Sequence, residues 1–518
     1  MRALLLVSLL AAVALPARAQ TVITSAGPEK VSVTLYRDPN RETGRAINRS
    51  YPQGYALITE TRTVTIPAGP AVIRFEGVAG NILPESALVA GLPDGVEEKN
   101  LDANLLSPRS LFDHALGRRV IVRRTDPATG KISLIQATLR SSSAGAAVLQ
   151  FGDGFGDLRC SGLPEALVYD GVPDGLSAKP TLSVKTVATA ARQVTLTLSY
   201  LAGGFDWQAD YVIAMNKDGR SADLFAWITL ASTDVTSFVD ADAQVVAGKP
   251  NRDPRSNYAP RNLGSIGYLR LQCWPLPEYD LDEQDGYGVP PPPPPPPPPA
   301  PVAAPMEIVV TGSRRAAGVM ANAAMATTEE LGDLKMYRFP TRVTVASQSQ
   351  KQVAMLNQPA ARLAPIYVAD VVEDTADTML LLRGKNLKAN GMGVAMPAGK
   401  ASILAEAGGQ MLVVGESAIA DKAVGEVIEF PMGRPQSVST NVVPTKRAGA
   451  GRTRYRLVVT NDQPWPIDYE AKLHLYDGQR VTGADHRLGK KDGEPLWSTS
   501  VPANGSATLT YTVAGVDD

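Results

Sequence analysis

Short runs in which apolar and polar residues alternate recur along most of the chain. They are rich in Val, Ile, Leu, Thr and Tyr, and they lie at residues 31–36, 63–66, 119–123, 193–200, 342–345, 454–460 and 508–513. Alternation at every second residue places apolar side chains on one face of a strand and polar side chains on the other. The pattern therefore predicts a mainly β protein of several antiparallel, β-sandwich-like domains, each sheet with one buried face.

A proline-rich segment interrupts this pattern. Ten consecutive prolines, Pro290–Pro299, cannot join a sheet because proline has a fixed φ and no backbone N–H. As polyproline II, at about 3.1 Å per residue, the run would be roughly 31 Å long. We expect residues 279–334 to be a disordered linker.

The linker gives the expected domain organisation of the chain. Residues 20–95 are expected to form an N-terminal β domain. Residues 96–278 and 335–518 are expected to be the two parts of a second β domain, the later part ending in a sandwich-like module.

The first nineteen residues have the pattern of a secretory signal peptide. Arg2 precedes an apolar run, Ala3–Leu15, and Ala17-Arg18-Ala19 supplies a small-x-small cleavage site. We expect an exported protein that resides in the periplasm. An outer-membrane-associated or extracellular position is the alternative. Since no later stretch reaches eighteen apolar residues, no transmembrane segment is expected in the mature chain.

Charge and cysteine content exclude several classes of protein. The 51 Lys and Arg against 52 Asp and Glu leave a formal charge of -1. The chain therefore lacks the excess of basic residues typical of proteins that bind nucleic acid, and no such binding is expected. Two Cys and three His exclude zinc fingers and a multi-disulfide framework. Cys160 and Cys273 would meet an oxidising compartment, where a disulfide and two unpaired thiols are both open alternatives.

An aromatic segment in the middle of the chain is its most distinctive stretch. After Gly203-Gly204, the side chains of Phe205, Trp207, Ala209 and Tyr211 alternate with those of Asp206, Gln208 and Asp210. One interpretation is a packed aromatic corner whose polar partners face solvent. The alternative is that Asp206 and Asp210 belong to a carboxylate or calcium site.

The sequence offers no recognisable catalytic arrangement. Its three histidines are His114, His474 and His486, and neither His474 nor His486 neighbours a Gly-x-Ser-x-Gly elbow. Zinc-protease, Walker and dinucleotide-binding motifs do not occur. We therefore assign no catalytic residue, metal site or cofactor, and expect a non-enzymatic protein.

Several segments resemble one known family. They are residues 198–211, 225–230 and 240–248 before the linker, and 337–356, 396–399, 414–416 and 497–513 beyond it. Together they look like the family of domain of unknown function 4139, which includes proteins related to mucoidy inhibitor A. The resemblance covers roughly residues 100–516, and residues 30–92 resemble the N-terminal β domain that often precedes it.

The resemblance implies β architecture and an envelope setting, and it brings no established catalytic residues. This chain departs from the mucoidy-inhibitor pattern in lacking a long coiled coil between the two parts. The motif residues that it carries are expected to be structural: Tyr200, Gly203, Gly204, Trp207, Asp210 and Tyr211.

One short peptide inside the linker suggests a partner. Met306–Arg314 resembles the TonB-box sequence of TonB-dependent receptors, and an extended peptide of this kind can add as a strand to a partner's sheet edge. Its docking residues would be Glu307, Ile308, Val309, Val310, Thr311, Gly312 and Ser313. Alternatively, the strand pattern arose within a linker, or the peptide pairs with the protein's own sheet.

These observations predict an exported envelope protein with a binding or scaffolding role, whose partner is an envelope protein or polysaccharide. A periplasmic partner of the TonB system is the first alternative. A hydrolase of envelope polysaccharide or peptide is the second, and it would require a cleft with two carboxylates about 5–9.5 Å apart.

Overall fold

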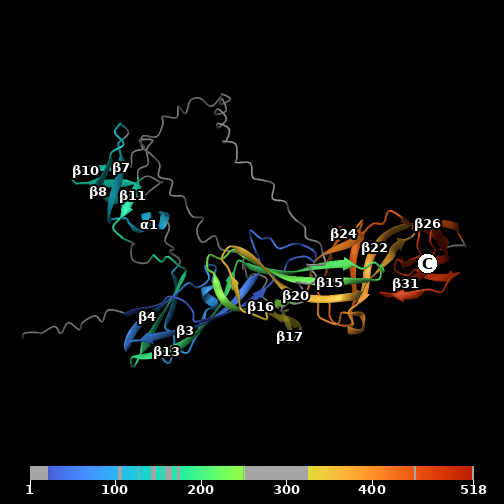
Figure 1. Ribbon diagram of the computed structural model, residues 1–518, viewed down its shortest axis with the longest axis horizontal. Helices are drawn as coiled ribbons and strands as arrows, with labels where there is room; N and C mark the ends of the chain where they lie inside the picture. The colour runs from blue at the N-terminus through green and yellow to red at the C-terminus, as the bar shows by residue number, and fades with distance from the viewer. Residues whose placement is uncertain are drawn as a thin grey trace, which may run out of the picture. The chain divides into compact units, whose positions relative to one another are not determined.

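The computed structural model describes residues 21–102, 108–126, 128–141, 147–152, 154–157, 166–171, 176–248, 250, 325–447 and 451–515 (Figure 1). Strands account for 64% of the structure and helices for 3%, which confirms the predicted mainly β fold. The predicted signal peptide, the TonB-box-like peptide, Cys160 and Cys273 lie outside the described residues. No helix in the described part of the chain combines the length and the apolar character needed to cross a membrane.

The chain divides into two compact units. The first includes residues 21–32 and 57–202, and the second includes residues 33–56, 203–248 and 325–515. The division passes through β2 (Lys30–Tyr36), β3 (Tyr55–Ile66) and β13 (Arg192–Gly203). These strands belong to an eight-stranded sheet of order β17-β18-β16-β2-β3-β13-β5, with β19 on β16.

The first unit contains a mixed four-stranded sheet of order β1-β4-β12-β6, with β1 parallel to β4. Its strands are β1 (Thr21–Ser25), β4 (Gly69–Glu76), β12 (Thr181–Ala188) and β6 (Glu98–Asp102). Because β12 pairs with both β4 and β6, the boundary expected between residues 95 and 96 falls inside this unit. A short 3-10 helix, η1 (Pro84–Ser86), and β5 (Leu88–Ala90) precede β6.

A small subdomain of the first unit has its own core. Helix α1 (Pro108–His114) precedes a five-stranded antiparallel sheet of order β10-β9-β8-β7-β11. The strands are β7 (Arg119–Thr125), β8 (Ile132–Ser141), β9 (Val148–Phe151), β10 (Gly154–Asp157) and β11 (Ala166–Tyr169). Phe112 of the helix packs with Val122, Leu139 and Leu149 of the sheet, so the helix covers the sheet's apolar face.

The second unit is built around a mixed sheet of order β20-β15-β14-β23-β24. Its strands are β14 (Phe205–Met215), β15 (Ser221–Ser232), β20 (Ser349–Arg362), β23 (Gly399–Ala407) and β24 (Gln410–Ile419). Strands β14 and β23 are parallel, with Ala209 opposite Gly399. This pair joins segments from either side of the predicted linker.

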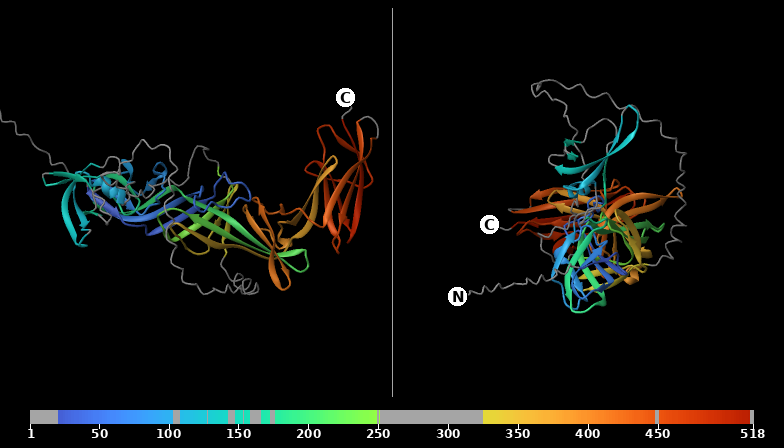
Figure 2. Two further views of the ribbon diagram at one scale, coloured as in Figure 1. Left: turned by 90° about the horizontal axis from the view of Figure 1, so that it is seen from above. Right: turned by 90° about the vertical axis from the view of Figure 1, so that its left-hand side faces the viewer.

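The C-terminal part of the second unit is a β-sandwich, which is coloured orange to red in Figure 2. One sheet contains β21 (Ala364–Val372), β22 (Thr375–Lys385), β25 (Val427–Gly433), β28 (Ile467–His474), β30 (Gly489–Lys491) and β31 (Glu494–Val501). The other contains β26 (Val438–Arg447), β27 (Arg452–Asn461), β29 (Arg480–Ala484) and β32 (Gly505–Ala514). Tyr469 and Trp497 of the first sheet share one buried core with Leu457 and Leu509 of the second, as in a sandwich.

Strand structure begins earlier than the expected end of the linker. Besides β16 (Phe238–Ala247), β19 (Val343–Val345) and the 3-10 helix η3 (Lys388–Asn390), the unit has a hairpin of β17 (Thr327–Leu331) and β18 (Leu334–Arg338). Residues 327–334 were expected to be linker because β17 lacks alternation: all five of its side chains are exposed. A two-residue turn with Gly332 at φ +60° forms the hairpin instead.

Candidate functional site

A polar loop of the second unit, residues 37–51, connects β2 to β3 and carries an arginine at every fourth position. We call it the arginine loop; its arginines are Arg37, Arg41, Arg45 and Arg49. Three turns shape it, closed by backbone bonds from the N–H of residue 41 to the oxygen of 38, from 45 to 42 and from 51 to 48. The arginines therefore lie on a segment shaped by turns and not on a helix.

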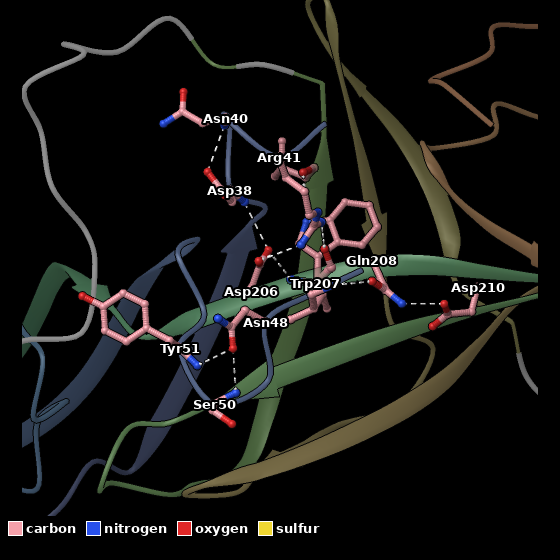
Figure 3. Close-up of polar contacts among 12 residues, drawn as sticks. Asp38, Asn40, Arg41, Asn48, Ser50, Tyr51, Asp206, Trp207, Gln208 and Asp210 are labelled. Atoms are coloured by element: carbon pink, nitrogen blue, oxygen red, sulfur yellow. Dashed lines mark hydrogen bonds and ion pairs between the residues drawn. The ribbon is translucent and has the colours of Figure 1, made fainter. Parts of the chain in front are cut away.

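Two of the arginines fix the loop to the rest of the unit, and Figure 3 shows one of them, Arg41. Arg41 Nη1 lies 2.7 Å from Asp206 Oδ2, and Arg41 Nη2 donates to the Trp207 carbonyl oxygen at 2.6 Å. These two ionised side chains are 9% and 3% exposed, so the pair is nearly free of solvent. Arg37 forms a second ion pair with Asp421, which lies just after the strand β24.

Burial dominates the electrostatics of Asp206. Its carboxylate accepts the backbone N–H groups of Asp38 at 3.1 Å and Trp207 at 2.8 Å, besides the Arg41 guanidinium. Desolvation nevertheless raises the pKa of Asp206 to about 6, since burial penalises the charged form more than these partners stabilise it. Asp206 is therefore a buried anchor of the arginine loop.

A chain of side-chain hydrogen bonds continues from the loop across three strands. Gln208 Oε1 accepts the Ile47 N–H at 2.9 Å, and Gln208 Nε2 donates to Asp210 Oδ1 at 2.6 Å. Thr229 of β15 donates to the other oxygen of Asp210 and accepts from Gln352 of β20 at 3.1 Å. Asp206 and Asp210 share no protein partner in these contacts, and each carboxylate has its own donors.

The expectation that these polar side chains face solvent is wrong for Asp206 and Gln208. Asp206 is 2% exposed and Gln208 is 9% exposed, because the arginine loop covers the face of β14 from which they project. Among the described residues, no group of three or more Asp, Glu, His and Cys side chains could hold a metal ion.

The aromatic side chains of the same strand lie in the core. Trp207 is fully buried, and its Nε1–H donates to the Val246 oxygen at 3.2 Å. The Tyr211 hydroxyl donates to the Pro397 oxygen at 2.6 Å, and burial raises the pKa of Tyr211 well above its ordinary value. The Tyr211 contact holds the segment before β23 against β14, and the Trp207 contact joins β14 to residue 246 of the second unit.

The other motif residues lie just before this strand. Gly203 ends β13, and Gly204 adopts φ +79°, a conformation that favours glycine, while its oxygen accepts the Thr233 N–H at 2.9 Å. Tyr200 belongs to the first unit, where it is fully buried and its hydroxyl donates to Glu60 at 2.6 Å. Arg62 completes that buried network by pairing with Glu60 at 2.6 Å.

In the described part of the chain, the histidine side chains contact carboxylates or a backbone oxygen. His114 Nδ1 contacts a backbone oxygen, that of Ser110, at 2.9 Å. His474 lies between the carboxylates of Asp370 and Glu494, and His486 contacts Asp485. The contacts seen among the described residues therefore give no histidine a hydroxyl or thiol partner to activate.

Two cavities of the second unit adjoin the arginine loop. The charged cavity, of about 480 Å³, is lined by four cationic side chains and three carboxylates: Arg37, Arg41, Arg45, Lys400, Asp38, Glu42 and Asp421. The polar cavity, of about 470 Å³, is lined by Arg49–Ser50, residues 231–233 and residues 348–350. Sequence reasoning missed this loop, although its arginine spacing is visible in the sequence.

No family model matches this chain, and no curated protein matches it.

Proposed function

We propose that this chain is an exported, non-enzymatic protein of the bacterial envelope that binds or scaffolds an envelope component. The observation that carries the proposal is the arginine loop. Arg37 and Arg41 form the ion pairs that fix the loop, whereas Arg45, at the charged cavity, and Arg49, at the polar cavity, are exposed and form no ion pair within the described part of the chain. A fixed backbone presenting free guanidinium groups favours binding, because little ordering is needed when the ligand arrives.

The sequence pattern of residues 1–19 supports the envelope setting, as does the resemblance to the family of domain of unknown function 4139. The parallel pairing of β14 with β23 is consistent with that resemblance, because it brings residues 209–214 beside residues 399–404. We therefore propose that the family's two sequence parts form one β domain in this chain, without the coiled coil of the mucoidy-inhibitor proteins.

Co-sedimentation with separated envelope fractions tests the binding role. Purified mature chain is mixed with outer-membrane vesicles, with peptidoglycan sacculi and with a matched buffer control, and each mixture is centrifuged. We expect the chain to sediment with one envelope fraction without releasing soluble fragments from it. Soluble sugar or peptide released in proportion to the amount of chain would instead indicate a hydrolase.

A partner of the TonB system is a second candidate, favoured by the sequence Glu307–Ser313, which lies outside the described residues. A β-rich peptide following a polyproline run is suited to strand addition on a partner's sheet. Pull-down with the periplasmic domain of TonB, using the full chain and a chain lacking residues 306–314, tests it. Equal capture of both would reject this candidate.

A further inference from the structure

The polar cavity is formed by three segments that are distant in sequence. Arg49 and Ser50 come from the arginine loop, residues 231–233 from the end of β15 and its following turn, and residues 348–350 from the start of β20. Strands β15 and β20 are paired here, with Ser232 opposite Ser349. The cavity thus has a sheet end on one side and a fixed loop on the other.

The two cavities differ in the charges of the side chains that line them, so they favour different ligands. In the charged cavity, Arg45 and Lys400 form no ion pair with any residue that the structure describes, and the carboxylates of Asp38 and Glu42 accompany them, so the charges nearly balance. In the lining of the polar cavity, as far as the structure describes it, Arg49 is the only ionisable side chain. The polar cavity therefore favours a ligand with one negative group.

Part of the cavity's hydrogen-bonding capacity maintains its walls. Ser349 Oγ donates to the Ala346 oxygen at 2.8 Å, Thr233 Oγ1 donates to the Gly204 oxygen at 3.3 Å, and Ser232 Oγ accepts the Asp234 N–H at 3.3 Å. These bonds order the hydroxyl groups before any ligand binds.

Three longer side chains remain available. Arg49, Gln348 and Gln350 are exposed, and within the described part of the chain their side chains form no hydrogen bond. A guanidinium presents a planar fork that matches carboxylate or phosphate oxygens, and each amide offers both donors and acceptors.

We propose that the polar cavity binds an acidic saccharide, with Arg49 on its carboxylate or phosphate and the glutamines and serines on its hydroxyl groups. Sugar hydroxyls donate and accept, which is also what the hydroxyl and amide lining does. A volume of 470 Å³ lies within the range of small-molecule sites. This inference rests on the proposed envelope-binding function and names its ligand class.

Calorimetric titration of the purified full chain tests the proposal with three probes: tetragalacturonate, glucose 1-phosphate and neutral maltotetraose. We expect at least one acidic probe to bind about tenfold or more tighter than maltotetraose, since one charge-assisted contact contributes about that factor. The two acidic probes distinguish a carboxylate source from a phosphate source.

Arg49→Gln is the test variant, and Arg480→Gln is its matched control, because Arg480 is an exposed arginine of the same unit that lines neither cavity. Arg49→Gln should weaken the acidic probe about tenfold, Arg49→Lys less, and Arg480→Gln less than twofold. Absence of any acidic-probe binding, equal binding of maltotetraose, or equal losses in Arg480→Gln and Arg49→Gln would overturn the proposal. Sedimentation with envelope fractions would persist in those cases if the proposed function alone is right.

Discussion

Replacing Arg41 by methionine should release the arginine loop. The substitution keeps most of the side chain's length but leaves Asp206, whose side chain is 3% exposed, with only two backbone N–H partners. Removing one member of a buried ion pair typically costs about 3–5 kcal/mol, because the remaining charge is uncompensated. We expect a loss of this size at pH 8, and a smaller loss at pH 5, where the carboxyl group can bind a proton.

Hydrogen exchange followed by mass spectrometry measures this loss locally. The amides of Asp38, Ile47 and Trp207 bond directly to Asp206 or Gln208 and report loop opening. A loss of about 3–5 kcal/mol corresponds to exchange that is about two to four powers of ten faster.

Two further variants make the experiment decisive. Arg45→Met, on the same loop but exposed, should leave exchange nearly unchanged. Adding Asp206→Leu to Arg41→Met removes the buried charge and should restore part of the protection. Unchanged exchange in Arg41→Met at pH 8, or equal acceleration in Arg45→Met, would refute the anchoring role.

Three other outcomes are expected. The pKa of Asp206 is about 6 in the folded protein against an ordinary 3.8, so the folded protein keeps the carboxyl proton to a higher pH than the unfolded chain does. Binding of this proton therefore stabilises the folded state, and about 3 kcal/mol of stability is lost as the pH rises from about 4 to about 6. Asp206→Asn should remove this pH dependence of the free energy of unfolding, measured by urea titration. Gly399→Ala should destabilise the second unit by about 1–3 kcal/mol, because the new Cβ would lie 2.1 Å from the Ala209 oxygen; an unchanged melting temperature would contradict this. Tyr200→Phe should cost the first unit about 1–3 kcal/mol by leaving the buried Glu60 carboxylate one donor short, and thermal unfolding measured beside an exposed-site control on the same strand as Glu60, Thr65→Val, checks it.

The fold class could be predicted because alternation is a local property of each strand. Residues 454–460 and 508–513 alternate clearly, and they belong to the paired strands β27 and β32 of the sandwich. Strand partners are not local, so the parallel pairing of β14 with β23 could not be predicted from either segment alone. The strand β17 was missed because it has no buried side chain to produce an apolar period.

The candidate site shows a different limit. Alternation along β14 separated Trp207 from Asp206 and Gln208, but it could not show that a loop covers the polar face. Only the structure shows that Arg41, more than 160 residues earlier in the chain, neutralises Asp206. The four-residue spacing of arginines also occurs on helices, so the sequence alone does not reveal that this segment folds as turns.

Fractionation of cells after chemical cross-linking shows whether the protein is exported and binds an envelope component. Mass spectrometry then identifies the N-terminus of the isolated chain and whatever is joined to it. We expect recovery from the periplasmic or outer-envelope fraction, with Gln20 as the first residue and a cross-linked envelope protein or glycan. Recovery from the cytoplasm with residues 1–19 intact would contradict this expectation.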